Sequence, residues 1–366
     1  MRILYDHQVF SLQNTGGASR YYYELIRSLV SNHEINVEVW LGVNQTVFPF
    51  RQLPRTHVVS CGKFLGRGHQ RYLANEILGN VVAAFAGQMD VYHSTLYRSM
   101  PLVRARGKVA THHDCAHERF PELFRNAREI VRAKRRLYAE ADGIICISKS
   151  SQADLLRFYD VDARKTRVIY HGLHRLHPSA PAMIELQARA KKPFLLFVGA
   201  RGGYKNFENL LRAFRATSLH KSMQLLALGG GVATDKEKSL TQELGLADCV
   251  RILPQVSDAL LAQAYAAATL LVYPSCCEGF GYPPLEAMAA GCPTLVCNTS
   301  CLPEICGDAP FYFEPDDQSS LQRMLIEAVT NEPARKLARE RGTRVAARYN
   351  WEKCAAETLA LYRECQ

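Results

Sequence analysis

Residues 270–297 read LLVYPSCCEGFGYPPLEAMAAGCPTLVC, and this stretch decides the fold. Residues 270–273 form a short apolar run, which is typical of a buried strand. Pro283 and Pro284 suit the first turn of a helix, where the backbone amides have no helical partners, and Gly291 followed by Pro293 is a stop signal. A second apolar run begins at Pro293. The stretch therefore predicts strand, helix and strand in succession, the unit from which parallel sheets are built.

The same alternation extends along most of the chain. Strands are expected at residues 2–5, 36–41, 57–60, 91–94, 108–111, 143–148, 167–170, 194–198, 223–228, 250–253, 270–273 and 293–296, with helical patterns between them. Because 366 residues exceed one typical core, we expect an α/β protein with two Rossmann-like, doubly wound domains. The pattern places an N-terminal domain at residues 1–172, a proline-bearing linker at 173–192 and a C-terminal domain at 193–345.

The loop after residue 273 carries candidate binding residues. Doubly wound folds bind ligands beyond the carboxyl ends of their strands, and two such domains are expected to face a central cleft. Gly279 and Gly281 flank Phe280, so the backbone can approach a ligand closely, and amides at a helix start favour a diphosphate. Glu278 and Glu286 are carboxylates suited to sugar or ribose hydroxyls. The structural alternative is a turn-forming glycine pair and a glutamate favoured by the helix dipole.

Two more strand-to-helix loops carry candidates. Arg201 and Lys205 flank two glycines before a predicted helix, and two cations there suit a diphosphate leaving group. An exposed ion pair is the alternative for them. Gly16 and Gly17 follow the first strand and open a helix, but they lack the GxGxxG fingerprint, so a nicotinamide cofactor is not indicated. A tight turn would explain this glycine pair equally well.

His112 and His113 end another predicted strand and precede Asp114. A histidine pair suggests a metal, but no further ligands follow at a familiar spacing. His113 is kept as a site candidate, with a core histidine bonded to backbone as the alternative. An Asp-x-Asp motif, which metal-dependent sugar transferases carry, occurs at Asp160 and Asp162, but it lies between a helix and a strand, away from the strand ends. We therefore expect neither a metal nor a cofactor.

With these motifs the sequence resembles the retaining glycosyltransferases of family 4, which have the two-domain GT-B architecture. The resemblance covers almost the whole chain, and its most specific element is the pair of glutamates Glu278 and Glu286 within EGFGYPPLEAMAAGCP. It implies that Glu278 contacts the donor sugar and that Glu286 contacts the ribose. The amides around Phe280 and Gly281 would then face the sugar and the diphosphate.

The resemblance also implies roles for the other loops. Arg201 and Lys205 would stabilise the departing diphosphate in place of a metal, although the family commonly spaces its arginine and lysine differently. Gly16 and Gly17 would lie near the donor phosphates and the acceptor, and His113 near the transferred sugar. In the resembling architecture a C-terminal helix, here residues 346–366, crosses back to the N-terminal domain.

These expectations describe a metal-independent hexosyltransferase. It would move a sugar from a nucleotide diphosphate donor to a saccharide or lipid-linked acceptor in surface polysaccharide assembly. The resemblance favours mannose from GDP-mannose as the first donor to test, followed by UDP-hexoses and dTDP-rhamnose. A catalytically silent nucleotide-sugar-binding protein, a nucleotide-sugar epimerase or phosphorylase, and a Rossmann oxidoreductase remain alternatives.

Charge distinguishes the two halves of the chain. Residues 1–180 hold 25 Lys+Arg and 15 Asp+Glu, whereas residues 181–366 hold 20 of each, so the net +10 lies in the first half. Within it, RNAREIVRAKRR at residues 125–136 predicts a basic helix for anionic lipid headgroups or a phosphate-bearing acceptor, or a solvated surface helix. Nucleic acid is not indicated, because no binding module accompanies the charge. Without a long apolar run or a signal peptide, we expect a cytoplasmic protein, peripheral at the inner face of the membrane.

Overall fold

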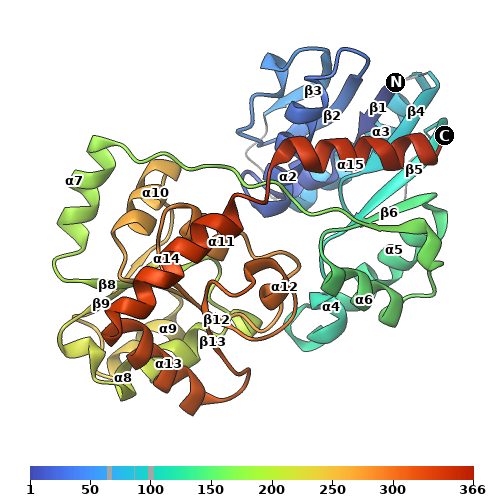
Figure 1. The fold of residues 1–366 in the computed structure, drawn as a ribbon. Coiled ribbons are helices and arrows are strands. Elements are labelled where there is room, and N and C mark those ends of the chain that lie inside the picture. Colours follow the sequence, from blue (N-terminus) through green and yellow to red (C-terminus); the bar gives the residue numbers. More distant parts are fainter. Residues whose placement is uncertain (64–67, 86, 98–102) are drawn as a thin grey trace. The chain divides into compact units, whose positions relative to one another are not determined.

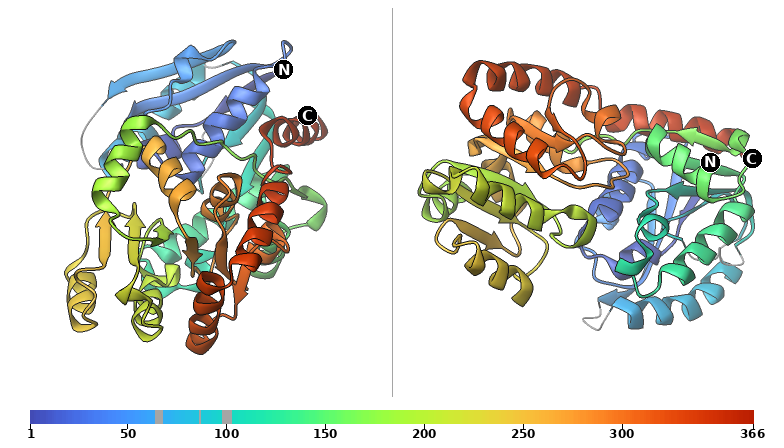
Figure 2. Two further views of the ribbon diagram at one scale, coloured as in Figure 1. Left: turned by 60° about the vertical axis from the view of Figure 1, so that its left-hand side comes forward. Right: turned by 90° about the horizontal axis from the view of Figure 1, so that it is seen from below.

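The computed structural model describes residues 1–63, 68–85, 87–97 and 103–366. The chain divides into two compact units: unit 1 comprises Met1–Gly172 and Asn350–Gln366, and unit 2 comprises Leu173–Tyr349. The last helix, α15 (Trp351–Glu364), thus belongs to unit 1, where it packs along α2 (Gly17–Leu29). Both ends of the chain lie close together in unit 1 (Figure 1 and Figure 2).

Unit 1 is built on a parallel sheet that has seven strands within the described residues, in the order β3-β2-β1-β4-β5-β6-β7. The strands are β1 (Arg2–Tyr5), β2 (Asn36–Asn44), β3 (Thr56–Lys63), β4 (Met89–Ser94), β5 (Ala105–His112), β6 (Gly143–Cys146) and β7 (Thr166–Val168). The remaining helices are α1 (Gln8–Leu12), α3 (Gly68–Phe85), α4 (Ala116–Arg119), α5 (Ala127–Glu140) and α6 (Lys149–Phe158). This order is that of a doubly wound fold.

Alternate residues of each strand fill the two faces of this sheet. Val37 and Val39 of β2 belong to the core that also holds the apolar faces of α2 and α15. Trp40, between Val39 and Leu41, points to the opposite core with Tyr92 of β4. The sheet is therefore buried on both sides, as parallel sheets usually are.

Unit 2 repeats the architecture, with a parallel sheet of six strands in the order β10-β9-β8-β11-β12-β13 within the described residues. The strands are β8 (Phe194–Val198), β9 (Gln224–Leu228), β10 (Val250–Leu253), β11 (Leu270–Tyr273), β12 (Thr294–Cys297) and β13 (Phe311–Phe313). The helices are α7 (Ala180–Arg189), α8 (Phe207–Ala216), α9 (Asp235–Glu243), α10 (Asp258–Ala267), α11 (Tyr282–Ala289), α12 (Leu302–Cys306), α13 (Gln318–Thr330) and α14 (Glu332–Ala346). The prediction of two doubly wound domains is confirmed.

Period-two alternation also explains the two cores of unit 2. Leu195 and Phe197 of β8 pack in the core that includes the apolar face of α8. Phe194 and Leu196 pack on the other face, in the core shared with α7 and α10. Figure 1 shows α8 and α10 on opposite faces of this sheet.

The predicted linker differs from the structure. Residues 173–192 include α7, whose first turn is capped by the Ser179 hydroxyl, which accepts a hydrogen bond from the Ala182 amide. Ala182 and Leu186 bury their side chains in the core that α7 shares with α10. Half of the predicted linker, residues 180–189, is thus a packed helix of unit 2. The proline-bearing pattern concealed this helix because proline is also tolerated in a first helical turn.

Candidate functional site

Unit 2 places two of the predicted loops at its topological switch point. Strands β8 and β11 are neighbours in the sheet, yet the chain continues from them toward opposite edges. Residues 199–206 follow β8 and residues 274–281 follow β11. Ligands of doubly wound folds bind where the strand order reverses, so these loops form the candidate site of unit 2.

Lys205 and Glu278 meet at this switch point. The Lys205 Nζ lies 2.5 Å from the Glu278 Oε1, and their side chains are 19% and 12% exposed. The Tyr273 hydroxyl donates to the same carboxylate oxygen at 2.6 Å, while the Glu278 amide donates to the Ser300 hydroxyl at 3.1 Å. Burial and the Glu278 carboxylate raise the pKa of Tyr273 well above its ordinary value, so its phenol stays a donor. Tyr273 and Ser300 thus hold Glu278 in place, and the pair remains partly accessible.

Backbone contacts join the two loops. The amide of Cys276 donates to the Tyr204 carbonyl at 2.8 Å, and the Asn206 side chain donates to the Cys276 sulfur at 3.6 Å. Lys205 ends a short 3-10 helix, Gly203–Lys205, and Asn206 caps α8 in the left-handed conformation at a φ of 61°. Lys205 therefore stands directly before the N-terminus of α8, where the helix dipole adds to its positive charge.

Arg201 does not join Lys205 in this structure. Its guanidinium is buried, with Nε donating to the Glu237 Oε1 at 2.8 Å and Nη2 donating to the Gly231 carbonyl at 3.0 Å. Nη1 donates to the Gly229 carbonyl at 2.5 Å. The glycines after β9 have positive φ and turn their carbonyls toward Arg201, which explains its direction. Here Arg201 stabilises a turn, and its predicted role beside a leaving phosphate stays a prediction.

The second glutamate, Glu286, lies on α11 and accepts a hydrogen bond from the Tyr265 hydroxyl at 2.9 Å. The helix begins after Gly281, whose φ is 88°, and a Cβ there would lie 2.9 Å from Leu302. This position favours glycine for both reasons. Phe280 is buried between the rings of Tyr282 and Tyr349. Gly279 and Phe280 can therefore offer a ligand little more than their main chain.

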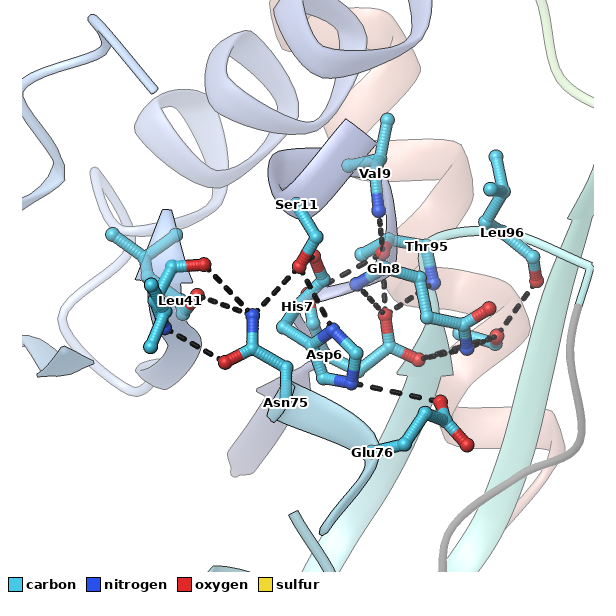
Figure 3. A network of polar contacts seen from close by, with 12 residues as sticks. Asp6, His7, Gln8, Val9, Ser11, Leu41, Asn75, Glu76, Thr95 and Leu96 are labelled. Atoms are coloured by element: carbon cyan, nitrogen blue, oxygen red, sulfur yellow. Dashed lines mark hydrogen bonds and ion pairs between the residues drawn. The ribbon is translucent and has the colours of Figure 1, made fainter. Parts of the chain in front are cut away.

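Unit 1 has a corresponding switch point between β1 and β4, built around the buried carboxylate of Asp6 (Figure 3). Asp6 accepts from the Gln8 side chain at 2.7 Å, from the Thr95 amide at 3.2 Å and from the hydroxyls of Tyr92 and Ser94. Asp6 was not among the predicted site residues, although a carboxylate at the end of the first strand was a usable signal. Its contacts fix the turn into α1, which precedes the glycine loop.

Gly16 and Gly17 open α2 after this turn. Gly17 is the first residue of the helix and Gly16 is its cap, with a φ of 174° that any residue can adopt. The Ser19 hydroxyl donates to the Gly16 carbonyl at 3.1 Å, which closes the first turn. The glycine pair is thus placed at the start of a helix at a switch point, the location expected for an anion-binding loop.

His113 follows the end of β5 and is buried among the rings of Tyr21, Tyr22 and Tyr97. Within the described part of the chain its Nε2 has no hydrogen-bond partner. Burial lowers its pKa to about 4, so the imidazole is neutral at pH 7. His113 is therefore a neutral, buried histidine whose Nε2 has no partner among the described residues.

The neighbouring histidine has a different environment. His112 bonds through Nδ1 to the Tyr138 hydroxyl at 2.6 Å and through Nε2 to the Cys115 sulfur at 3.5 Å. It is a core histidine, and the two do not act as a chelating pair. No group of three or more metal-binding side chains is arranged to hold an ion in the part of the chain that the structure describes.

The Asp-x-Asp motif lies after α6 and before β7. Its second carboxylate, Asp162, is on the surface, where the Arg164 guanidinium lowers its pKa to about 2. The motif is thus at the amino end of β7, away from the strand ends that carry the candidate site.

Comparison with known families decides what these two units are. The family model described as "Glycosyl transferases group 1" matches residues 182–345, and the one described as "Glycosyltransferase Family 4" matches residues 15–175. The chain belongs to the group 1 glycosyltransferases of family 4. The two matched ranges of this glycosyltransferase include Gly16, Gly17, His113, Glu278 and Glu286.

Comparisons with individual relatives and solved structures are consistent with this family. The glycosyltransferase is 29% identical over 288 residues to O-antigen chain mannosyltransferase B of Escherichia coli, an alignment that covers 75% of this chain and 74% of the relative. Among solved structures, sucrose-phosphate synthase from Thermosynechococcus elongatus has a TM-score of 0.81 and 20% identity, over 99% of this chain and 98% of that chain. An Anabaena protein solved with UDP and glucose has a TM-score of 0.76 and 19% identity, over 98% and 99% of the two chains. The glycosyltransferase thus has the GT-B fold.

Proposed function

We propose that this glycosyltransferase moves a hexose, with retention, from a nucleotide diphosphate sugar to a saccharide or lipid-linked acceptor in surface polysaccharide assembly. Mannose from GDP-mannose is the first donor to test, because a relative over three quarters of the chain carries the name of an O-antigen mannosyltransferase. UDP-hexoses come next, because a structural neighbour was solved with UDP and glucose.

The ion pair between Lys205 and Glu278 is the observation that carries the proposal. It lies at the switch point of unit 2, it is partly accessible, and its two charges match the diphosphate and the sugar hydroxyls of a nucleotide sugar. Lys205, beside the N-terminus of α8, suits the diphosphate, and Glu278 suits the hydroxyls of the sugar. In the proposed complex the donor separates this pair and satisfies each partner.

The proposed reaction breaks the bond between the anomeric carbon and the diphosphate oxygen. The acceptor hydroxyl forms the new bond from the same face, and its proton passes to the departing phosphate. Negative charge grows on the phosphate in the transition state, so Lys205 binds more tightly as the bond breaks. The resemblance assigns Arg201 to the same charge, which would require it to leave Glu237.

The resemblance assigns the remaining proposed contacts to residues of both units. His113 offers its unpaired Nε2 to the transferred sugar, and Gly16 and Gly17 offer amides at the start of α2. Glu286 binds the ribose. Glu278 positions the donor and forms no covalent bond. Because cationic side chains and helix amides neutralise the diphosphate, the proposed reaction requires no metal.

The function is tested by screening donors and then by breaking the ion pair. GDP, UDP and dTDP are first compared by thermal shift, and the matching nucleotide sugars are then incubated with glycan acceptors. We expect one donor to be consumed only when an acceptor is present. Lys205→Met should lower kcat/KM by roughly 10 to 100-fold, the value of one charge-assisted hydrogen bond.

The alternatives give other results. A silent binding protein would show the thermal shift without turnover, and an epimerase would change the donor sugar without an acceptor. A phosphorylase would need inorganic phosphate, and an oxidoreductase would respond to NAD(P). A glycosyl adduct trapped on Glu278 would contradict the positioning role of that carboxylate.

We further propose that unit 1 contacts an anionic membrane through α5. The helix and the residues before it expose Arg125, Arg128, Arg132, Arg135 and Arg136. No helix of the described residues is long and apolar enough to cross a membrane, so the proposed contact is electrostatic. Liposomes with phosphatidylserine should retain the protein at low salt and release it at high salt. Equal binding to neutral liposomes would contradict the contact.

A further inference from the structure

The inner face of α5 carries a buried lysine. The helix buries Ala127, Lys134, Leu137 and Tyr138, whereas its arginines point outward. The Lys134 side chain has no exposed surface, and its partner Glu118 is only 3% exposed. Burying an ammonium without partners is very unfavourable, so the contacts of Lys134 show what the lysine is for.

Those contacts saturate the ammonium. Lys134 Nζ donates to the two carboxylate oxygens of Glu118 at 3.0 and 3.2 Å and to the main-chain carbonyl of Asp114 at 2.8 Å. It also lies 4.4 Å from the centre of the Tyr97 ring. Glu118 accepts a further hydrogen bond from the Tyr159 hydroxyl. All three ammonium hydrogens therefore have acceptors.

The contacts lead directly to the His113 segment. Asp114, whose carbonyl Lys134 binds, is the residue after His113, and its carboxylate accepts from the Ala116 amide at 3.0 Å to start α4. Glu118 belongs to the same helix α4. Lys134 thus connects the end of β5, α4 and α5 at one atom. The His113 Nε2 has no hydrogen-bond partner among the described residues, so the contacts of Asp114 with Lys134 and Ala116 hold the segment.

Stability alone does not account for the pair. Replacing a buried ion pair with well-packed apolar side chains is often neutral or stabilising, so a hydrophobic pair would hold α4 to α5 equally well. An apolar side chain cannot donate to the Asp114 carbonyl. We propose that Lys134 and Glu118 form a positioning pair that fixes the His113 segment for glycosyl transfer, an inference that rests on the proposed role of His113.

The electrostatics of the segment agree with this role. Burial raises the pKa of the Asp114 carboxyl, but the Lys134 ammonium and the Ala116 amide outweigh it and hold that pKa below its ordinary value. Asp114 therefore stays ionised beside a neutral His113. The segment keeps one charge state around neutral pH, which helps to hold one geometry.

The test removes both charges together, so that neither is left buried alone. In Lys134→Met/Glu118→Gln we expect kcat to fall by roughly 10 to 100-fold, the effect of a misplacement on the order of 1 Å. The donor KM should change by less than kcat, because the proposed donor contacts of Lys205, Glu278 and Glu286 are left intact. The His113 ring signal, observed by NMR in protein labelled at histidine, should shift or broaden.

A matched control separates positioning from general loosening of α4. Arg119 of α4 forms a two-fold contact with Asp154 of α6, and its Nε lies 3.0 Å from the Asp154 Oδ2. Arg119→Met/Asp154→Asn removes this pair without touching the Asp114 carbonyl. It should leave kcat and the His113 signal as in the wild type. A kcat loss of equal size in the control would overturn the positioning role.

Two more variants keep the test decisive. If the double variant does not fold, Tyr159→Phe removes only the hydroxyl that binds Glu118 and should produce a smaller kcat loss with the same shift of the His113 signal. Unchanged kcat and an unchanged signal in every folded variant would overturn the inference. His113→Ala tests the proposed role of His113 separately. If this variant keeps full activity, that proposed role fails. If it loses activity while Lys134→Met/Glu118→Gln keeps full activity, only the positioning pair is refuted.

Discussion

Each unit contains a lysine–glutamate ion pair close to its strand ends, and the two pairs differ in burial. In unit 1, Lys134 and Glu118 are 0% and 3% exposed. In unit 2, Lys205 and Glu278 are 19% and 12% exposed. The buried pair also binds a main-chain carbonyl, whereas the accessible carboxylate accepts from the Tyr273 hydroxyl and the Glu278 amide donates to Ser300. The buried pair can therefore fix the geometry of the protein. In the accessible pair, each residue can exchange the other for a ligand.

The loops around the pairs differ in the same sense. His113 of unit 1 is surrounded by tyrosines, and burial lowers its pKa to about 4. In unit 2 the corresponding loops place Gly281 in the left-handed region of the backbone. Their charged side chains, Lys205 and Glu278, are partly exposed. Under the proposed function, units of the same topology have different roles: an uncharged contact at His113 and a charged binding loop at Lys205 and Glu278.

Breaking each pair from one side should give the largest difference between the units. Lys134→Met leaves the Glu118 carboxylate buried without its cation and should lower the free energy of unfolding of unit 1 by about 3 to 5 kcal/mol. Lys205→Met leaves a carboxylate that water can reach, and unit 2 should lose less than about 1 kcal/mol. Urea unfolding of the two variants measures both. Equal losses would show that the difference in burial has no energetic consequence.

Acid should destabilise unit 1 through its buried histidines. Burial lowers the pKa of His93 to about 3 and that of His113 to about 4. The unfolded chain takes up these protons near pH 6.5, whereas the folded unit does not, so stability falls as the pH drops below 6.5. The loss is about 1.4 kcal/mol per pH unit for each histidine, down to its folded pKa.

A single substitution checks this pH dependence. His113→Gln removes one titrating group. Between pH 6 and pH 5 the slope of the unfolding free energy against pH should therefore fall by about 1.4 kcal/mol per pH unit, the value for one proton. His220 of unit 2 is only partly buried, and His220→Gln provides the comparison, for which a smaller change in slope is expected. An unchanged slope in His113→Gln would mean that this histidine is protonated in the folded state.

Much of the fold followed from periodicity. The predicted strand at residues 270–273 matches β11, and the helix expected at residues 346–366 corresponds to α15, which begins at Trp351. The sheet order then explains why Lys205 and Glu278 meet, since both follow strands at the switch point. Local patterns did not predict that contact, because the order of strands in a sheet is set by packing between distant segments.

Other parts of the site could not be predicted from local patterns. Arg201 turns toward Glu237, which is far along the chain and belongs to the capping box of α9. Lys134 left one usable signal: it shares the helical stripe of Ala127 and Tyr138, so the pattern put a charge on the apolar face of α5. Its partner Glu118 lies on a helix too short to be recognised by periodicity.

The smallest predicted difference concerns the glycine at the start of α2 and the one at the start of α11. Gly281→Ala forces a side chain into the left-handed region and against Leu302, so unit 2 should lose roughly 1 to 2 kcal/mol. Gly16 has extended backbone, and a Cβ there meets only the end of the flexible Gln13 side chain, so Gly16→Ala should change stability by less than about 0.5 kcal/mol. Urea unfolding compares the two. If Gly16→Ala costs as much as Gly281→Ala, the glycine loop of unit 1 is conformationally strained as well, and strain at these loops no longer distinguishes the units.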